Sequence, residues 1–398
     1  MSKMLALCSA IDLKIKGGCT PFYWSLFAAL NRIGVDVTVM PFSGKTVQSL
    51  WWTAQDNPVR TNSLIGLLSK PYSLLNKTKI SSNPSLKETP AYVRSTPNLK
   101  QVIVNCQERK WGKLWLKSIE NTLTKEKYDF IVMFCPPVHI IAPYVSYLRN
   151  KYNLPILLYE ADFPTYLFNS ELFKTSWYAT IDLSVFDGVI VNSEGVLPKL
   201  GELGVKNSFA FDFGADASAL SYPSQQKDID VSFYGYGSFK REDAIKTMIT
   251  LPSKKLRNRK FVVAGPFQID LGCVTRLKGL NNMEMKRLCY RSKINLNITR
   301  STFAETTSSS TARLFELAMM GACIVSNPYS GIEKWFKPND EVLIVHDVEE
   351  ALETYATLLS DDAFCANIGK KARERALRDH TYDNRALEFQ EIICKVLY

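Results

Sequence analysis

The stretch from Thr306 to Pro328, TTSSSTARLFELAMMGACIVSNP, constrains the fold of this chain more than any other. Its small hydroxylated residues suit a helix N-terminus, and the ARLFELAMM segment that follows is apolar on nearly every face, which is typical of a buried helix. Gly321 then predicts the helix end, and ACIVS predicts a short buried strand. The stretch therefore predicts a buried helix followed directly by a buried strand.

Arg313 and Glu316 are the only charges inside this predicted helix, and their i, i+3 spacing puts them on one face. Buried charges are unfavourable unless they are paired or bind a ligand. One interpretation is that the two side chains pair with each other, although the order with the cation first is the less favourable one. The other is that the helix N-terminus faces an anion with Arg313 assisting, while Glu316 accepts a hydroxyl. The residues alone leave both interpretations open.

Apolar runs that alternate with helical patterns predict a parallel α/β fold. Each predicted strand ends in a polar or small cluster, and ligands of such sheets bind beyond the carboxyl ends of the strands. Strands are predicted at residues 4–10, 35–40, 128–135, 155–164 with the exit included, 260–266, 294–300 and 322–326, and helices at 22–33, 111–123, 138–152, 283–293, 348–377 (two) and 380–397. A further strand followed by a helix is predicted in 187–205, and a strand, a glycine-rich turn and a helix in 229–243.

The length of 398 residues suits two domains. A small, polar and weakly patterned stretch predicts a linker between them, and a segment rich in Pro, Ser, Asn and Lys predicts an irregular insertion in the first. The predicted parts are a first domain at 1–213 with its insertion at about 41–100, the linker at 214–228, a second domain at 229–380 and a final helix at 381–398.

The segment RLFELAMMGACIVSNPYSGIEKWFKPNDEVLIVHDVEEALE resembles the C-terminal domain of nucleotide-sugar glycosyltransferases of the GT-B fold. In that family a glutamate–apolar–Ala–Met–Gly–Ala helix is followed by a strand and a Pro-x-x-Gly-x-x-Glu turn. The most similar subgroup is the one described as glycosyl transferases group 1 or spore maturation protein-like, and the likeness covers roughly residues 155–390. The resemblance implies two Rossmann-like domains that face a central cleft, with the last helix crossing back to the first domain.

The resemblance also implies donor-binding residues in the second domain. The YGYGSFKR segment at 234–241 follows a predicted strand, so its glycines would let backbone amides approach phosphates and its basic pair would supply charge. The alternative for this segment is an ordinary solvated helix start. The residues that the family's donor site implies here are Gly235, Gly237, Ser238, Lys240, Arg241, Thr311, Arg313 and Glu316, the last of them on the donor ribose.

One position departs from the family pattern. Many retaining members carry a second glutamate eight positions before the one that corresponds to Glu316, and here that position is Ser308. Because that glutamate contacts the donor sugar, the identity of the sugar and the retaining stereochemistry are both open.

Carboxylates after a strand of the first domain are candidates for the catalytic base. Asp162 and Glu160 lie in YEADFP, where strand alternation puts both on one face unless the proline exit breaks it. A carboxylate there could deprotonate an acceptor hydroxyl. The segment is similar to the Asp-x-x-Pro strand exit of the phage-type enzymes that glucosylate hydroxymethylated bases in DNA, so Asp162 ranks first, Glu160 second and His139 third. The alternative for these carboxylates is a helix cap or a salt-bridged turn.

Three further residues are candidates for the acceptor side of the cleft. Gly17 and Gly18 follow the first predicted strand, where a backbone could approach a ligand, although a simple turn explains them as well. Ser193 starts a predicted helix, and a plain N-cap explains it fully.

Composition limits the other classes of site and partner. Nine cysteines without a CxxC pair and three histidines argue against a zinc site and favour reduced thiols in a cytoplasmic protein. Neither a metal nor another cofactor is predicted, and no obligate protein partner is evident. No apolar run reaches membrane-spanning length. The net charge of +10 would suit peripheral contact with an anionic membrane or with DNA.

The sequence thus predicts a glycosyltransferase that uses a nucleotide-sugar donor, with UDP-sugar favoured by family frequency, and an acceptor hydroxyl on a glycan, glycolipid or other cell-envelope polymer. One alternative is a transferase acting on hydroxymethylated bases in DNA. An alternative of another class is a non-catalytic protein of the same fold that binds nucleotides or sugars.

Overall fold

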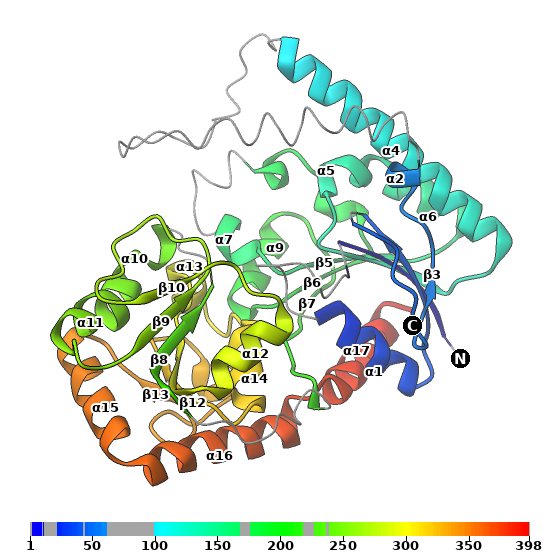
Figure 1. Cartoon of the computed structure of the whole chain (residues 1–398). Coiled ribbons are helices and arrows are strands. Elements are labelled where there is room, and N and C mark those ends of the chain that lie inside the picture. Colours follow the sequence, from blue (N-terminus) through cyan, green and yellow to red (C-terminus); the bar gives the residue numbers. More distant parts are fainter. Residues whose placement is uncertain are drawn as a thin grey trace.

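The computed structural model describes residues 2–9, 11, 22–42, 44–61, 99–167, 176–217, 227–235 and 239–397. Within these residues two parallel sheets stand side by side, each covered by helices on both faces (Figure 1). Parallel strands are buried on both faces, which is why the sequence shows them as short, continuous apolar runs.

The first sheet has seven strands in the order β3-β2-β1-β4-β5-β6-β7. Its core divides into two layers, one under α1 and one under α4 and α6. Its strands are β1 Lys3–Cys8, β2 Asp36–Pro41, β3 Thr53–Ala54, β4 Phe130–Phe134, β5 Ile156–Glu160, β6 Gly188–Val191 and β7 Ser208–Ala210, and its helices are α1 Phe22–Arg32, α2 Pro58–Thr61, α4 Leu99–Lys125, α5 Val138–Ile141, α6 Val145–Tyr152, α7 Phe163–Leu167 and α9 Leu197–Glu202.

The second sheet has six strands in the order β10-β9-β8-β11-β12-β13. A π-helical turn at Lys246–Thr250 joins α10 to α11. The strands are β8 Ile229–Tyr234, β9 Phe261–Ala264, β10 Thr275–Leu277, β11 Ser292–Asn297, β12 Cys323–Ser326 and β13 Leu343–Ile344, and the helices are α10 Glu242–Ile245, α11 Leu251–Lys255, α12 Asn282–Tyr290, α13 Ser301–Ala304, α14 Ala312–Met319, α15 Val348–Ser360, α16 Asp362–Asp379 and α17 Tyr382–Leu397.

Helix α17 returns from the second sheet to the first and packs beside α1, as predicted (Figure 1). Its Phe389 is 1% exposed, and the ring stacks on Phe134 of β4 and meets Phe211 edge-on, with ring centroids 6.1 and 5.5 Å apart. The helix thus completes one face of the first sheet.

We expect Phe389→Ala to lower the free energy of unfolding by about 3–5 kcal/mol, because it removes a ring from a closed aromatic cluster and leaves a cavity. Leu387→Ala on the same helix is the matched control, since Leu387 is 53% exposed and its replacement should change stability by less than about 0.5 kcal/mol. Chemical denaturation of both variants measures this. Equal stability of the two would contradict the packing role of α17.

The predicted insertion at 41–100 is only partly irregular. Residues 44–61 add β3 to the sheet edge, where Trp52 is buried with its ring 4.6 Å from that of Trp24 while Trp51 is exposed. The helix predicted at 111–123 extends from Leu99 to Lys125. Residues 62–98 lie outside the described part of the chain, as does most of the predicted linker.

The cysteines of the described residues are all free. Among them Cys8, Cys289, Cys323 and Cys365 are buried, whereas Cys106, Cys273 and Cys394 are exposed. Among the described helices, none is long and apolar enough to cross a membrane.

Candidate active site

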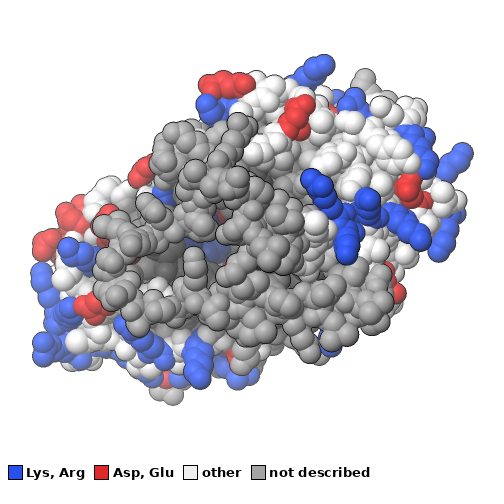
Figure 2. Space-filling model, turned by 90° about the horizontal axis from the view of Figure 1, so that it is seen from above, with Lys and Arg blue, Asp and Glu red and all other residues white. Residues whose placement is uncertain are grey.

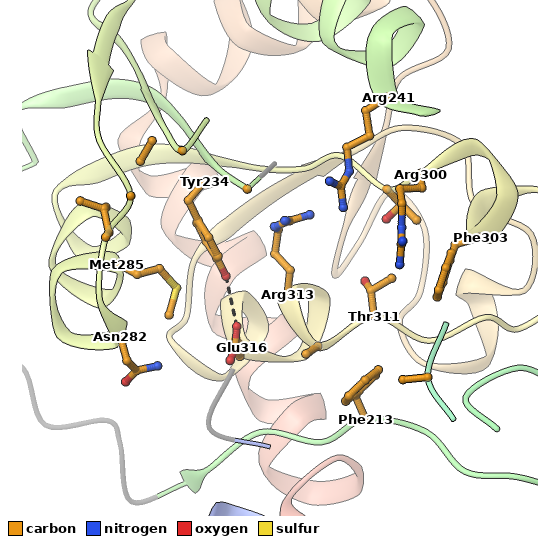
Figure 3. Close-up of a pocket in the computed structure, with 18 of the residues that line it drawn as sticks. Phe213, Tyr234, Arg241, Asn282, Met285, Arg300, Phe303, Thr311, Arg313 and Glu316 are labelled. Atoms are coloured by element: carbon orange, nitrogen blue, oxygen red, sulfur yellow. Dashed lines mark hydrogen bonds between the residues drawn. The ribbon is translucent and has the colours of Figure 1, made fainter. Parts of the chain in front are cut away.

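A cavity of about 270 Å³ lies between the two sheets, at the carboxyl ends of their strands (Figure 3). The first sheet contributes Ala161 and Asp162, which follow β5, and Asn192, which follows β6. The second contributes the turns after β8, β9 and β11 and the start of α14. The cavity therefore occupies the place where open parallel sheets bind ligands.

Three arginines meet at this cavity: Arg241 before α10, Arg300 before α13 and Arg313 in the first turn of α14 (Figure 3). Withdrawal from water lowers the pKa of Arg241 to about 8, and repulsion by Arg313 and Arg300 adds to this. Burial likewise lowers the pKa of Arg313. Crowded and desolvated cations are unfavourable by themselves, so the arrangement is suited to an anion.

Arg313 is held by groups that leave its charge available. One guanidinium nitrogen, Nη1, donates to the Ile298 carbonyl at 2.9 Å, and the group lies over the rings of Phe233 and Tyr234 at 4.9 and 5.1 Å. Its buried Nε has no hydrogen-bond partner among the described residues. A Cβ at Gly235 would lie 2.7 Å from Nη2, so a glycine is needed there for the arginine to approach β8 this closely.

Glu316 lies one helical turn after Arg313 and also faces the cavity. Its Oε2 accepts a hydrogen bond from the Tyr234 hydroxyl at 3.2 Å, and desolvation raises its pKa to about 7. Arg313 and Glu316 attract each other electrostatically, but the hydrogen bonds that the structure describes for them go to the Ile298 carbonyl and the Tyr234 hydroxyl, not to each other. The buried helix turns its one charged face to the cavity.

We expect Glu316→Gln to raise the free energy of unfolding at pH 8 by about 1–3 kcal/mol, because the folded state holds this carboxyl at a pKa above its ordinary value of 4.5. The folded protein then binds the extra proton between pH 4.5 and 7, so wild-type stability falls as pH rises through that window and the variant's advantage disappears below it. Denaturation curves at pH 4.5 and 8 measure this. Glu353→Gln, on the exposed side of α15, should show no such difference, and a less stable Glu316→Gln at pH 8 would contradict the assignment.

Asp162 lies at the cavity, and Glu160 does not. The Asp162 side chain is about half exposed, and its Oδ1 is 2.7 Å from Arg300 Nη2 across the two sheets. Glu160 is buried, accepts hydrogen bonds from the Tyr178 hydroxyl and the Asp162 backbone, and has its pKa raised to about 7 by desolvation. The strand ends between the two residues, so they do not share one face as alternation predicted.

His139 and Ser193 have partners away from the cavity lining. His139 Nε2 is 3.3 Å from Glu108 Oε1 on α4. Ser193 does not cap a helix with its side chain; its Oγ is 2.6 Å from that of Ser309, so it joins the two halves of the molecule. Ser193 thus occupies the N-cap position before Glu194, as the N-cap explanation expects, but its side chain makes no capping hydrogen bond.

Ser308, at the place of the family's second glutamate, packs away from the cavity. It is 4% exposed and has a φ of 48°, and its backbone amide donates to the Ser330 carbonyl. A Cβ on Gly331 would lie 2.6 Å from Ser308 Oγ. A glutamate at this position would have to displace the turn at Gly331.

Of the other predicted donor residues, Thr311 and Gly235 line the cavity, whereas Lys240 lines a neighbouring cavity of about 390 Å³. Gly237, Ser238, Gly17 and Gly18 lie outside the described residues. Sequence reasoning missed Arg300, Thr299 and Asn192. Their signal was their position at the ends of predicted strands, in INLNITR and DGVIVN.

Comparisons with known proteins agree with this geometry. Residues 241–391 match the family described as glycosyl transferase-like, and no curated protein matches the sequence. Sucrose-phosphate synthase of Thermosynechococcus elongatus is 14% identical with a TM-score of 0.66, covering 100% of this chain and 99% of that one. Anabaena HepE (Alr3699) in complex with UDP and glucose is 12% identical with a TM-score of 0.61, covering 99% of this chain and 100% of that one. T4 phage BGT in complex with UDP-glucose is 11% identical with a TM-score of 0.55, covering 99% of each chain. The protein therefore has the GT-B fold, and its glycosyl transferase-like part contains Arg241, Arg300, Arg313 and Glu316.

Proposed function

We propose that this protein is a glycosyltransferase that moves a sugar from a nucleoside-diphosphate donor to an acceptor hydroxyl. The observation that carries the proposal is the group of three arginines, Arg241, Arg300 and Arg313, that line a cavity between the two sheets, with Glu316 one helical turn after Arg313. The match of residues 241–391 supports the same class of reaction.

The donor would lie against the second sheet. Arg241, Arg300 and Arg313, together with the backbone amides at the start of α14, would hold the diphosphate and stabilise its charge as it leaves. This arrangement would need no metal. Glu316 would accept a ribose hydroxyl, and UDP is the favoured nucleotide because the similar Anabaena and T4 structures are complexes with UDP or UDP-glucose.

The acceptor would enter from the first sheet. Asp162 would take the proton of the acceptor hydroxyl as its oxygen bonds to the anomeric carbon and the bond to the diphosphate oxygen breaks. An inverting transfer uses a base in this way, and the absence of the second glutamate at Ser308 is in keeping with a departure from the retaining members.

We infer the class of acceptor from the positive charge of the protein surface. Figure 2 shows Lys and Arg spread over both lobes of the visible face, with fewer Asp and Glu. A basic face suits an anionic glycan or glycolipid at a membrane surface. The likeness to T4 phage BGT favours hydroxymethylated DNA as the second candidate, and a steep fall of DNA binding with added salt would support that candidate.

A thermal-shift panel of nucleoside diphosphates and nucleotide sugars, run on wild type and Glu316→Ala, tests the donor site. We expect one nucleotide to raise the wild-type Tm and to lose most of this effect in the variant, because a ligand stabilises the state that binds it. If no nucleotide shifted the wild-type Tm, the proposed donor site would be contradicted.

A further inference from the structure

The ion pair between Asp162 and Arg300 joins the two sides of the cavity. Asp162 follows β5 of the first sheet, Arg300 precedes α13 of the second, and Oδ1 and Nη2 are 2.7 Å apart. The proposed base is therefore paired with a cation in this structure. Neither side chain is buried: Asp162 is 51% exposed and Arg300 is 28% exposed. The two side chains can therefore separate with little desolvation of other groups.

Arg300 also belongs to the arginine group. Its guanidinium lies over the ring of Phe303 at 4.3 Å, and it lines the same cavity as Arg241 and Arg313 (Figure 3). It is close enough to Arg241 that the repulsion between them lowers the pKa of Arg241. One cation thus lies within reach of both the base carboxylate and the position of the diphosphate.

We propose that Arg300 is a shared cation that pairs with Asp162 as seen here and moves to the donor diphosphate when the donor binds. The move frees the Asp162 carboxylate to take the acceptor proton, so the base becomes available only when a leaving group is in place. Arg300 is therefore a positioning residue that couples donor binding to the base. This inference rests on the proposed donor site.

If Arg300 moves in this way, Asp162 should weaken donor binding, which a purely structural ion pair would not do. Asp162 and the diphosphate compete for one guanidinium, so the carboxylate weakens donor binding in the wild type. Removing its charge releases Arg300. A partly exposed ion pair contributes up to about 1 kcal/mol, so we expect Asp162→Asn to bind a nucleoside diphosphate about 3- to 6-fold more tightly.

Calorimetric titration with UDP and with inorganic pyrophosphate, which needs no base recognition, tests the coupling. The control is Glu194→Gln, which breaks another ion pair between the two halves, that of Glu194 with Lys334 at 2.7 Å, away from the cavity. We expect a lower Kd for Asp162→Asn and an unchanged Kd for Glu194→Gln. Equal tightening in both variants would assign the effect to loosened domains and overturn the inference.

A double-mutant cycle with Arg300→Met separates the shared cation from the general effect of removing a negative charge. If Arg300 is shared, Asp162→Asn gives no tightening in the Arg300→Met background. Tightening that persists there, or an Asp162→Asn variant that binds no more tightly than wild type, would overturn the coupling alone. A wild type that binds neither UDP nor pyrophosphate would overturn the proposed donor site as well.

Discussion

Replacing Asp162 by Asn is expected to lower kcat for sugar transfer by about 10²–10⁴-fold, the usual contribution of a general base. The amide keeps the size of the side chain and removes its ability to take a proton. Because the side chain is about half exposed, the variant should fold as the wild type does. The KM for the donor should stay the same or fall, since the donor-binding residues are intact. Steady-state kinetics with the donor and acceptor found by screening measures both constants.

Glu160→Gln is the matched comparison. Glu160 is two residues earlier but is buried against Tyr178, outside the cavity lining. We expect it to lower kcat by less than about tenfold, as a structural change two residues from the base would. If Glu160→Gln abolished transfer and Asp162→Asn did not, the assignment of the base would be wrong.

The second large effect is expected for Arg313→Met, which should weaken nucleoside-diphosphate binding by about 10²-fold or more. Arg313 lies in the first turn of α14, and loss of charge-assisted hydrogen bonds to a diphosphate removes about 3 kcal/mol. Methionine fills most of the same space between Phe233 and Tyr234. The free energy of unfolding should therefore be unchanged or higher, because a poorly solvated charge is replaced by an apolar side chain.

Arg291→Met is the control for Arg313→Met. Arg291 pairs with Asp228 at the opposite end of the sheet from the cavity, so its loss should leave nucleotide affinity unchanged. Calorimetric titration and chemical denaturation of both variants separate binding from folding. Unchanged nucleotide binding in Arg313→Met would contradict the donor site.

Much of the fold could be predicted because the strands of a doubly covered parallel sheet are apolar along their whole length. The run IVMF in β4 and the run CIVS in β12 are examples. The charged face of α14 could also be predicted, since Arg313 and Glu316 interrupt an otherwise apolar helix. The position of a residue along its strand, however, does not predict which turns of the two sheets lie opposite each other in the cleft.

Arg300 shows this limit most clearly. In the sequence it is one arginine after an ordinary strand, and its meaning comes from Asp162, 138 residues away. Glu160 and Ser193 show the reverse case. Glu160 is the last residue of β5 and Ser193 comes soon after β6, as site residues would, but each has a tertiary partner, Tyr178 or Ser309, that no local pattern reveals.

Release of nucleoside diphosphate from nucleotide sugars, measured without an acceptor, tests the central claim most directly. The account predicts slow release from one nucleotide sugar by the wild type, with water replacing the acceptor hydroxyl, and at least a 100-fold lower rate in Arg313→Met, for which a loss of about 3 kcal/mol is expected. Binding of the nucleotide sugar without any release, with or without candidate acceptors, would contradict it and indicate a binding protein that uses the same fold.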